Sequence, residues 1–175
     1  QATYYPDEGG GNTNNDRYSS FDLVQGVGIY GGFSGTETSL SQRNSNPATN
    51  NTILSGDIDG TPGDNTNNAH HVVSADAVTA ASILDGFTIT GGNTEGDGHF
   101  GGGAYVVNAS PTLRNLVITN NQSPTGGGGG MFLGTDPGET ASGPLLTNIT
   151  FSNNIAERGG GLFNQNSNPI LTNVI

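Results

Sequence analysis

A repeated pattern of glycine and apolar residues limits the folds open to this chain more than any other feature. Gly-Gly-Gly runs end at positions 103, 130 and 161, and each is followed directly by an apolar pair. A second pattern, a leucine followed by alternating apolar residues, comes after each run and also once upstream. Its leading residues are Leu84, Leu113, Leu146 and Leu171. Spacings of 29 (84 to 113), 33 (113 to 146) and 25 (146 to 171) residues are typical of a solenoid with one repeat per turn.

Each repeat holds short apolar-alternating runs of strand length, separated by glycine and asparagine clusters. No run is long enough or periodic enough for a helix. One repeat cannot bury its apolar face alone, but coils stacked about 4.8 Å apart share a narrow core. The sequence therefore predicts an all-β parallel β-helix with about 25–33 residues per coil. We assign residues 27–175 to this solenoid, expected to continue beyond the chain end, and residues 1–26 to an irregular or capping segment.

Equivalent positions of the repeat predict columns of side chains that run from coil to coil. The leading leucines form one aliphatic column. A second inward column contains Ile89, Ile118 and Phe151. A third column, at a bend, contains Asn115, Asn148 and Asn173, with Gly86 one coil earlier. Asparagine tolerates left-handed backbone, and its amide can bond to the next asparagine, so we expect a structural ladder here.

An aromatic column follows the glycine runs, and its direction decides its role. It contains Tyr105, Phe132 and Phe163. If these rings face inward, they belong to the core. If they face outward, they form a stacked strip that could hold sugar rings or pack against another chain. We favour core or packing.

The composition limits the kinds of partner that this chain can bind. The chain of 175 residues has 15 acidic residues against four basic ones, all arginine, so a nucleic-acid backbone would be repelled. Only 31% of the residues are hydrophobic, which fits a narrow core. There is no cysteine, which excludes a disulfide scaffold. The sequence also holds no run apolar enough for a membrane span, so we expect no membrane insertion within this segment.

Two stretches carry a resemblance to a known group of proteins. Residues Val27 to Arg43 and Thr52 to Gly60 resemble the N-terminal coils of bacterial right-handed β-helix surface proteins of the pectin-lyase-like superfamily. The Gly-Gly-Gly-apolar and Ile-Thr-x-Asn-Asn repeats are similar to those of chlamydial polymorphic outer-membrane proteins. The likeness covers roughly residues 20 to 175. It implies a right-handed solenoid, which the crossover rule also favours, and an extracellular or cell-surface location on a bacterium.

The resemblance alone leaves the activity open, because this superfamily contains enzymes, adhesins and structural proteins. Its pectate lyases use a basic residue beside calcium-bound acidic sugar, and its polygalacturonases use aspartates on adjacent coils. Neither constellation is visible in this sequence. The charged strand column contains Asp85 and Arg114 on neighbouring coils, where we expect an exposed ion pair contributing roughly 0.2–1 kcal/mol.

We therefore expect a non-catalytic structural or adhesive segment of a large extracellular or cell-surface protein, with filament formation as one form of that role. The alternative is a polysaccharide-binding or polysaccharide-degrading domain of the same fold, so enzymatic activity stays undecided. The expected partners are further copies of the chain, associated end to end or laterally, or surface polysaccharide.

One loop has the chemistry of a calcium site. Asp57, Asp59 and Asp64 bring three carboxylates into a Gly- and Pro-rich segment, and hard oxygen ligands on a flexible loop suit Ca²⁺. The segment lacks the twelve-residue EF-hand frame and its terminal Glu. The alternative is a solvated acidic turn in which the aspartates bond to the backbone. Asp97 is a weaker acidic candidate in a neighbouring glycine-rich loop.

Overall fold

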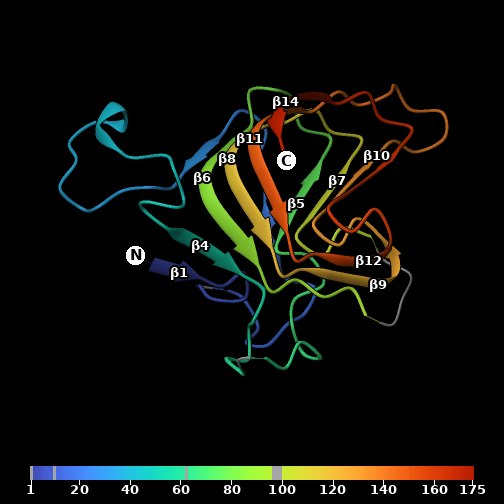
Figure 1. The fold of residues 1–175 in the computed structure, drawn as a ribbon, viewed down its shortest axis with the longest axis horizontal. Coiled ribbons are helices and arrows are strands. Elements are labelled where there is room, and N and C mark those ends of the chain that lie inside the picture. Colours follow the sequence, from blue (N-terminus) through green and yellow to red (C-terminus); the bar gives the residue numbers. More distant parts are fainter. Residues whose placement is uncertain (1, 10, 62, 96–99) are drawn as a thin grey trace.

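The chain folds into a parallel β-solenoid of about three turns (Figure 1). The computed structural model describes residues 2–9, 11–61, 63–95 and 100–175. Every pairing between its strands is parallel. Within these residues the helical content is one short 3₁₀ turn, η1, at Leu40–Gln42. The predicted all-β parallel β-helix is confirmed.

Three parallel sheets run along the solenoid. Sheet A is the largest, with seven strands, and its path is β1 (Ala2–Tyr4), β4 (Thr52–Ser55), β6 (Ile83–Thr90), β8 (Thr112–Thr119), β11 (Leu145–Ser152) and β14 (Ile170–Val174), with β3 (Gly28–Tyr30) also paired to β6. Sheet B has five strands, β13 (Leu162–Gln165), β10 (Met131–Gly134), β7 (Ala104–Val107), β5 (Val73–Asp76) and β2 (Phe21–Asp22). Sheet C consists of β12 (Ile155–Arg158) and β9 (Gln122–Gly127).

The strand register confirms the repeat. Leu84 pairs with Leu113, Leu113 with Leu146, and Leu146 with Leu171, so the leading leucines form one column. The second column is also in register, with Ile118 between Ile89 and Phe151. The leucines of the inner coils and both isoleucines are at most 1% exposed and Phe151 is partly buried, whereas Leu171 on β14 is 48% exposed. Neighbouring coils thus supply one another's core.

The bend inside the long strands of sheet A comes from single residues in left-handed backbone. Asn115, Asn148 and Asn173 have φ values of 53°, 55° and 52°, and Gly86 occupies the same place on β6 with φ 91°. Asparagine and glycine adopt this conformation at little cost, whereas other residues are strained there. The predicted asparagine bend is confirmed.

The N-terminal part of the chain takes part in the sheets. Strand β1 pairs with β4 in sheet A, and β2 pairs with β5 in sheet B. The solenoid sheets therefore begin before residue 27, the position at which the sequence pattern placed the boundary between capping segment and solenoid.

One coil is interrupted by a long excursion, residues 31–51. Strand β3 pairs with residues 83–85 of β6, and β4 pairs with residues 88–90 of the same strand. The chain therefore leaves sheet A just before the bend of β6, forms η1, and returns to pair with β6 just after the bend. A capping box between Ser39 and Gln42 fixes this turn. The excursion stands beside sheet A and forms a wall next to the asparagine bend.

Candidate functional site

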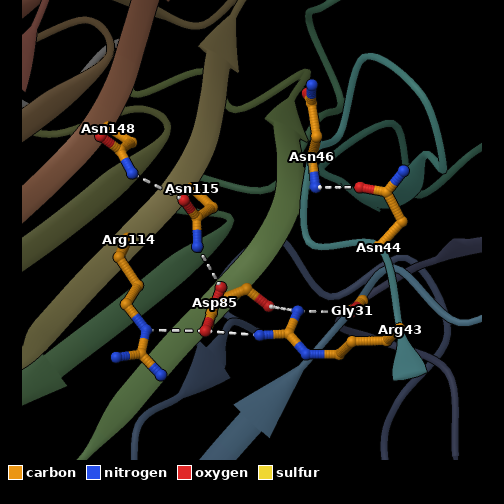
Figure 2. Close-up of polar contacts among 8 residues, drawn as sticks. All are labelled: Gly31, Arg43, Asn44, Asn46, Asp85, Arg114, Asn115 and Asn148. Carbon is orange, nitrogen blue, oxygen red and sulfur yellow. Dashed lines mark hydrogen bonds and ion pairs between the residues drawn. The ribbon is translucent and has the colours of Figure 1, made fainter. Parts of the chain in front are cut away.

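The most concentrated set of charged contacts centres on Asp85, on strand β6 (Figure 2). Its side chain is 2% exposed. Oδ2 accepts from Nη2 of Arg43 at 2.5 Å and from Nε of Arg114 at 2.7 Å. Oδ1 accepts from Nδ2 of Asn115 at 2.8 Å. A buried carboxylate is tolerated when it is paired and hydrogen-bonded in this way.

The expectation of an exposed ion pair at Asp85 is wrong, and the reason is Arg43. This residue comes from the excursion, outside the repeat, and its guanidinium covers the carboxylate. Its side chain is 7% exposed, donates to the carbonyl of Gly31 at 2.8 Å and lies over the ring of Tyr30 at 5.2 Å. Arg114 is the expected partner, but its side chain is 41% exposed and forms only the outer part of the cluster.

Asp85 also ends the asparagine ladder. Asn173 donates to Asn148 at 2.9 Å, Asn148 donates to Asn115 at 3.0 Å, and Asn115 donates to the carboxylate. The amides thus point the same way along the solenoid and end on a negative charge. Aligned hydrogen bonds of this kind polarise and strengthen one another. The predicted structural ladder is confirmed, with a carboxylate terminus that the sequence pattern did not reveal.

A groove of about 390 Å³ runs between this ladder and the excursion. Its floor consists of the ladder amides, of residues just after the bend in β8 and β11, and of Ile175 after β14. Its opposite wall is a short segment of the excursion. The lining residues are Ser45, Asn46, Pro47, Asn115, Leu116, Val117, Asn148, Thr150, Asn173 and Ile175. None of these side chains is charged.

A second pair of stacked amides lies at the next turn. This pair was not predicted from the sequence. Asn120 and Asn153 have left-handed backbone, with φ values of 56° and 52°, and the residue after each turns inward. Asn121 is fully buried and donates from Nδ2 to Oδ1 of Asn154 at 3.1 Å. Its Oδ1 accepts from the backbone of Gly92 at 3.0 Å. The Asn-Asn doublet, repeated on two coils, is the signal that could have predicted this pair.

The aromatic column lies on the outer face of sheet B. Met131 and Leu133 belong to the core cluster, so Phe132 between them points the other way. Tyr105 and Phe132 stack with ring centres 5.5 Å apart, and Phe132 and Phe163 lie 5.9 Å apart. Phe100 also stacks on Phe132 with ring centres 4.8 Å apart, so Phe132 is only 5% exposed. The aromatic column therefore faces outward and is not part of the core. Its rings pack against each other.

Burial also affects the acid–base behaviour of this column. The pKa of Tyr105 is raised, first by burial of the phenol and then by the negative charges of Asp136 and Asp76. The tyrosine therefore stays protonated over the physiological range. Its role in the stack is that of a neutral ring.

The acidic loop holds its carboxylates in local hydrogen bonds. Oδ1 of Asp57 and Oδ1 of Asp59 each accept from the backbone N–H of Thr61 at 3.1 Å. Oδ1 of Asp64 accepts from the backbone of Thr66 at 3.0 Å. The Thr61 hydroxyl lowers the pKa of Asp59, and the Thr66 backbone N–H lowers that of Asp64. These are the bonds of the acidic-turn alternative.

In the part of the chain that the structure describes, no three His, Cys, Asp or Glu side chains lie close enough together to hold a metal ion. Calcium binding by Asp57, Asp59 and Asp64 stays a prediction. Asp97 lies outside the described residues.

Within residues 2–9, 11–61, 63–95 and 100–175, no helix is long and apolar enough to cross a membrane. The comparisons add no relative whose role could be considered for this chain. No family model, curated protein or solved structure matches it.

Proposed function

We propose that this chain is a non-catalytic structural or adhesive segment of a large extracellular or cell-surface bacterial protein. The observation that carries the proposal is the continuity of the columns from coil to coil. Leucine, asparagine and aromatic side chains each stack in register, so the segment is stiffened both inside and outside its core. A stiff rod that displays a long, regular surface suits spacing and adhesion.

The charges of the Asp85 cluster support a structural role. Arg43 is buried against Asp85 and a backbone carbonyl, so its guanidinium serves to fix the excursion. Arg114 uses its Nε on the same carboxylate. In this arrangement both oxygens of the Asp85 carboxylate accept hydrogen bonds from side chains of the chain itself.

The proposal includes association between copies of the chain. Strand β14 pairs with β11 along one edge and carries exposed apolar side chains, with Ile170 60% and Leu171 48% exposed. An unpaired strand edge recruits further strands unless another coil covers it, so in the 175-residue chain this edge is the contact offered for end-to-end association. Sedimentation of the 175-residue chain over a range of concentrations tests this part, with higher-order species growing as concentration rises. A strictly monomeric chain at every concentration contradicts it.

The enzymatic alternative is tested directly by turnover. The purified chain is incubated with neutral and acidic polysaccharides, with and without Ca²⁺, and new chain ends are measured. We expect no turnover above a heat-inactivated sample. Cleavage that is abolished in Arg114→Gln or Asp85→Asn, and retained in the control Arg158→Gln, would overturn the non-catalytic role.

A further inference from the structure

We infer that the amide-lined groove between the excursion and the asparagine ladder binds a linear, uncharged polysaccharide that runs parallel to the solenoid axis. This inference rests on the adhesive part of the proposed function and names its partner. The groove volume of about 390 Å³ lies within the range of about 300–1,000 Å³ found for ligand sites.

The floor of the groove offers unused hydrogen-bonding groups at a regular spacing. A side-chain amide has two N–H groups and two oxygen lone pairs. Within the described residues, Asn115 and Asn148 each use one N–H and one lone pair in the ladder. Each coil therefore presents one further donor and one further acceptor, and the pair repeats at the coil spacing of about 4.8 Å.

This spacing favours a sugar chain over a peptide. One coil is comparable in length with one sugar ring, so successive rings can place a hydroxyl group opposite successive amides. An extended peptide repeats its N–H and C=O groups on one edge only every two residues, which is about 6.6–6.8 Å. A peptide that places a hydrogen-bonding group opposite the amide of one coil would not place one opposite the amide of the next coil.

The lining selects for an uncharged and partly apolar ligand. Pro47 and Val117 contribute hydrocarbon surface on the two sides of the groove, and Asn46 and Thr150 add polar groups. None of the lining side chains is charged, and the whole chain has a net charge of −11, which repels carboxylated and phosphorylated polymers. Sugar rings combine hydroxyl groups with apolar C–H faces and match this mixture.

The groove is also held in shape before a ligand arrives. Its wall belongs to the excursion that Arg43 fastens to Asp85, and its floor ladder ends on the same carboxylate (Figure 2). Asn50 adds a bond from Nδ2 to the carbonyl of Gly32 at 2.7 Å. The Asn50 bond closes the excursion on itself, and Asp85 on β6 holds both the wall and the floor of the groove, which lowers the ordering cost of binding.

The test is a calorimetric titration with neutral oligosaccharides from the disaccharide to the hexasaccharide, together with oligogalacturonate. We expect neutral ligands to bind, with affinity rising as the ligand spans more coils. Val117→Glu places a carboxylate in the groove without touching the ladder and should weaken binding by about tenfold. The matched control is Thr119→Glu, on the same strand and outer face but outside the groove lining. It should bind as the unmodified chain does.

Melting curves of both glutamate variants show whether each remains folded. Val117→Thr is a milder second variant that keeps the groove uncharged and should retain binding. Equal binding by Val117→Glu and the unmodified chain overturns the inference, as does preferential binding of oligogalacturonate. If no neutral glycan binds and no polysaccharide is cleaved, the groove assignment fails while the structural role stands. Cleavage that depends on Arg114 instead defeats the proposed function itself.

Discussion

At the scale of single residues, the structure depends on side chains that satisfy an unusual backbone. The bend asparagines have left-handed φ values and also bond to one another, so each contributes in two separable ways. The repeat made these residues predictable, because the same type recurs at the same position. That the ladder ends on Asp85 was not predictable. The bend position of this coil is Gly86, which has no side chain, and the carboxylate comes from the residue before it.

Substitutions at Asn148 separate the two contributions. Asn148→Gly keeps the backbone conformation and loses two exposed side-chain bonds, whereas Asn148→Ala also places a Cβ at φ 55°. We expect the alanine variant to be the less stable of the two by about 0.5–1 kcal/mol. Urea unfolding of both variants measures the difference. An alanine variant as stable as the glycine variant would contradict the role of the left-handed bend.

Glu37 gives a pH-dependent signature of the excursion. Its carboxylate accepts from the backbone and hydroxyl of Ser34 and from the backbone of Gly35 and Thr36, and these bonds lower its pKa from 4.5 to about 2. A lowered pKa means that the bonds stabilise the folded loop above pH 4.5 and that this contribution is lost as the pH falls from 4.5 towards 2.

Amide NMR shifts of residues 34–36 should therefore titrate with a midpoint of about 2. In Glu37→Gln the same amides should lose this titration. A midpoint near 4.5 in the unmodified chain would show that the carboxylate does not make these bonds in solution.

At the scale of elements, the repeat and the excursion differ in how far the sequence predicts them. The strands and their register follow from recurring leucines, and the structure confirms them. The place of residues 31–51 could not be predicted, because this segment occurs once and its anchor, Arg43, contacts a residue 42 positions away. The groove depends on that placement, so the sequence alone did not reveal it either.

The two arginines of the Asp85 cluster should differ in their effect on stability. Arg43→Ala removes a buried partner from a buried carboxylate, which we expect to cost about 3 kcal/mol. Arg114→Ala removes a partly exposed partner and should cost about 1 kcal/mol or less. Chemical denaturation of both variants gives the comparison. Equal losses would contradict the assignment of Arg43 as the anchor of the excursion.

At the scale of the whole molecule, stability comes from contacts between adjacent coils. Each coil buries its leucine only because the next coil covers it, and the difference between fully buried Leu146 and half-exposed Leu171 shows this directly. The outer stacks extend the same principle to the surface. A rod built in this way keeps its shape wherever its columns remain in register.

Calcium would act on the whole molecule by fixing the acidic loop. If Asp57, Asp59 and Asp64 bind Ca²⁺, added calcium should raise the melting temperature and a chelator should reverse the rise. Asp59→Asn serves as the comparison and should show a smaller response. An unchanged melting temperature in the unmodified chain would remove the calcium prediction.

Engineered disulfides measure most directly whether the repeats stack as parallel coils in the register found here. The chain has no cysteine, so a pair can be introduced without competition. Thr119 and Ser152 are register partners with hydroxyls 3.0 Å apart, within reach of a disulfide, whereas Thr119 and Thr150 are offset by two residues. Peptide mapping of both double-cysteine variants should find a disulfide at 119–152 and free thiols at 119 and 150. A disulfide in the offset pair, with free thiols in the register pair, would contradict the solenoid described above.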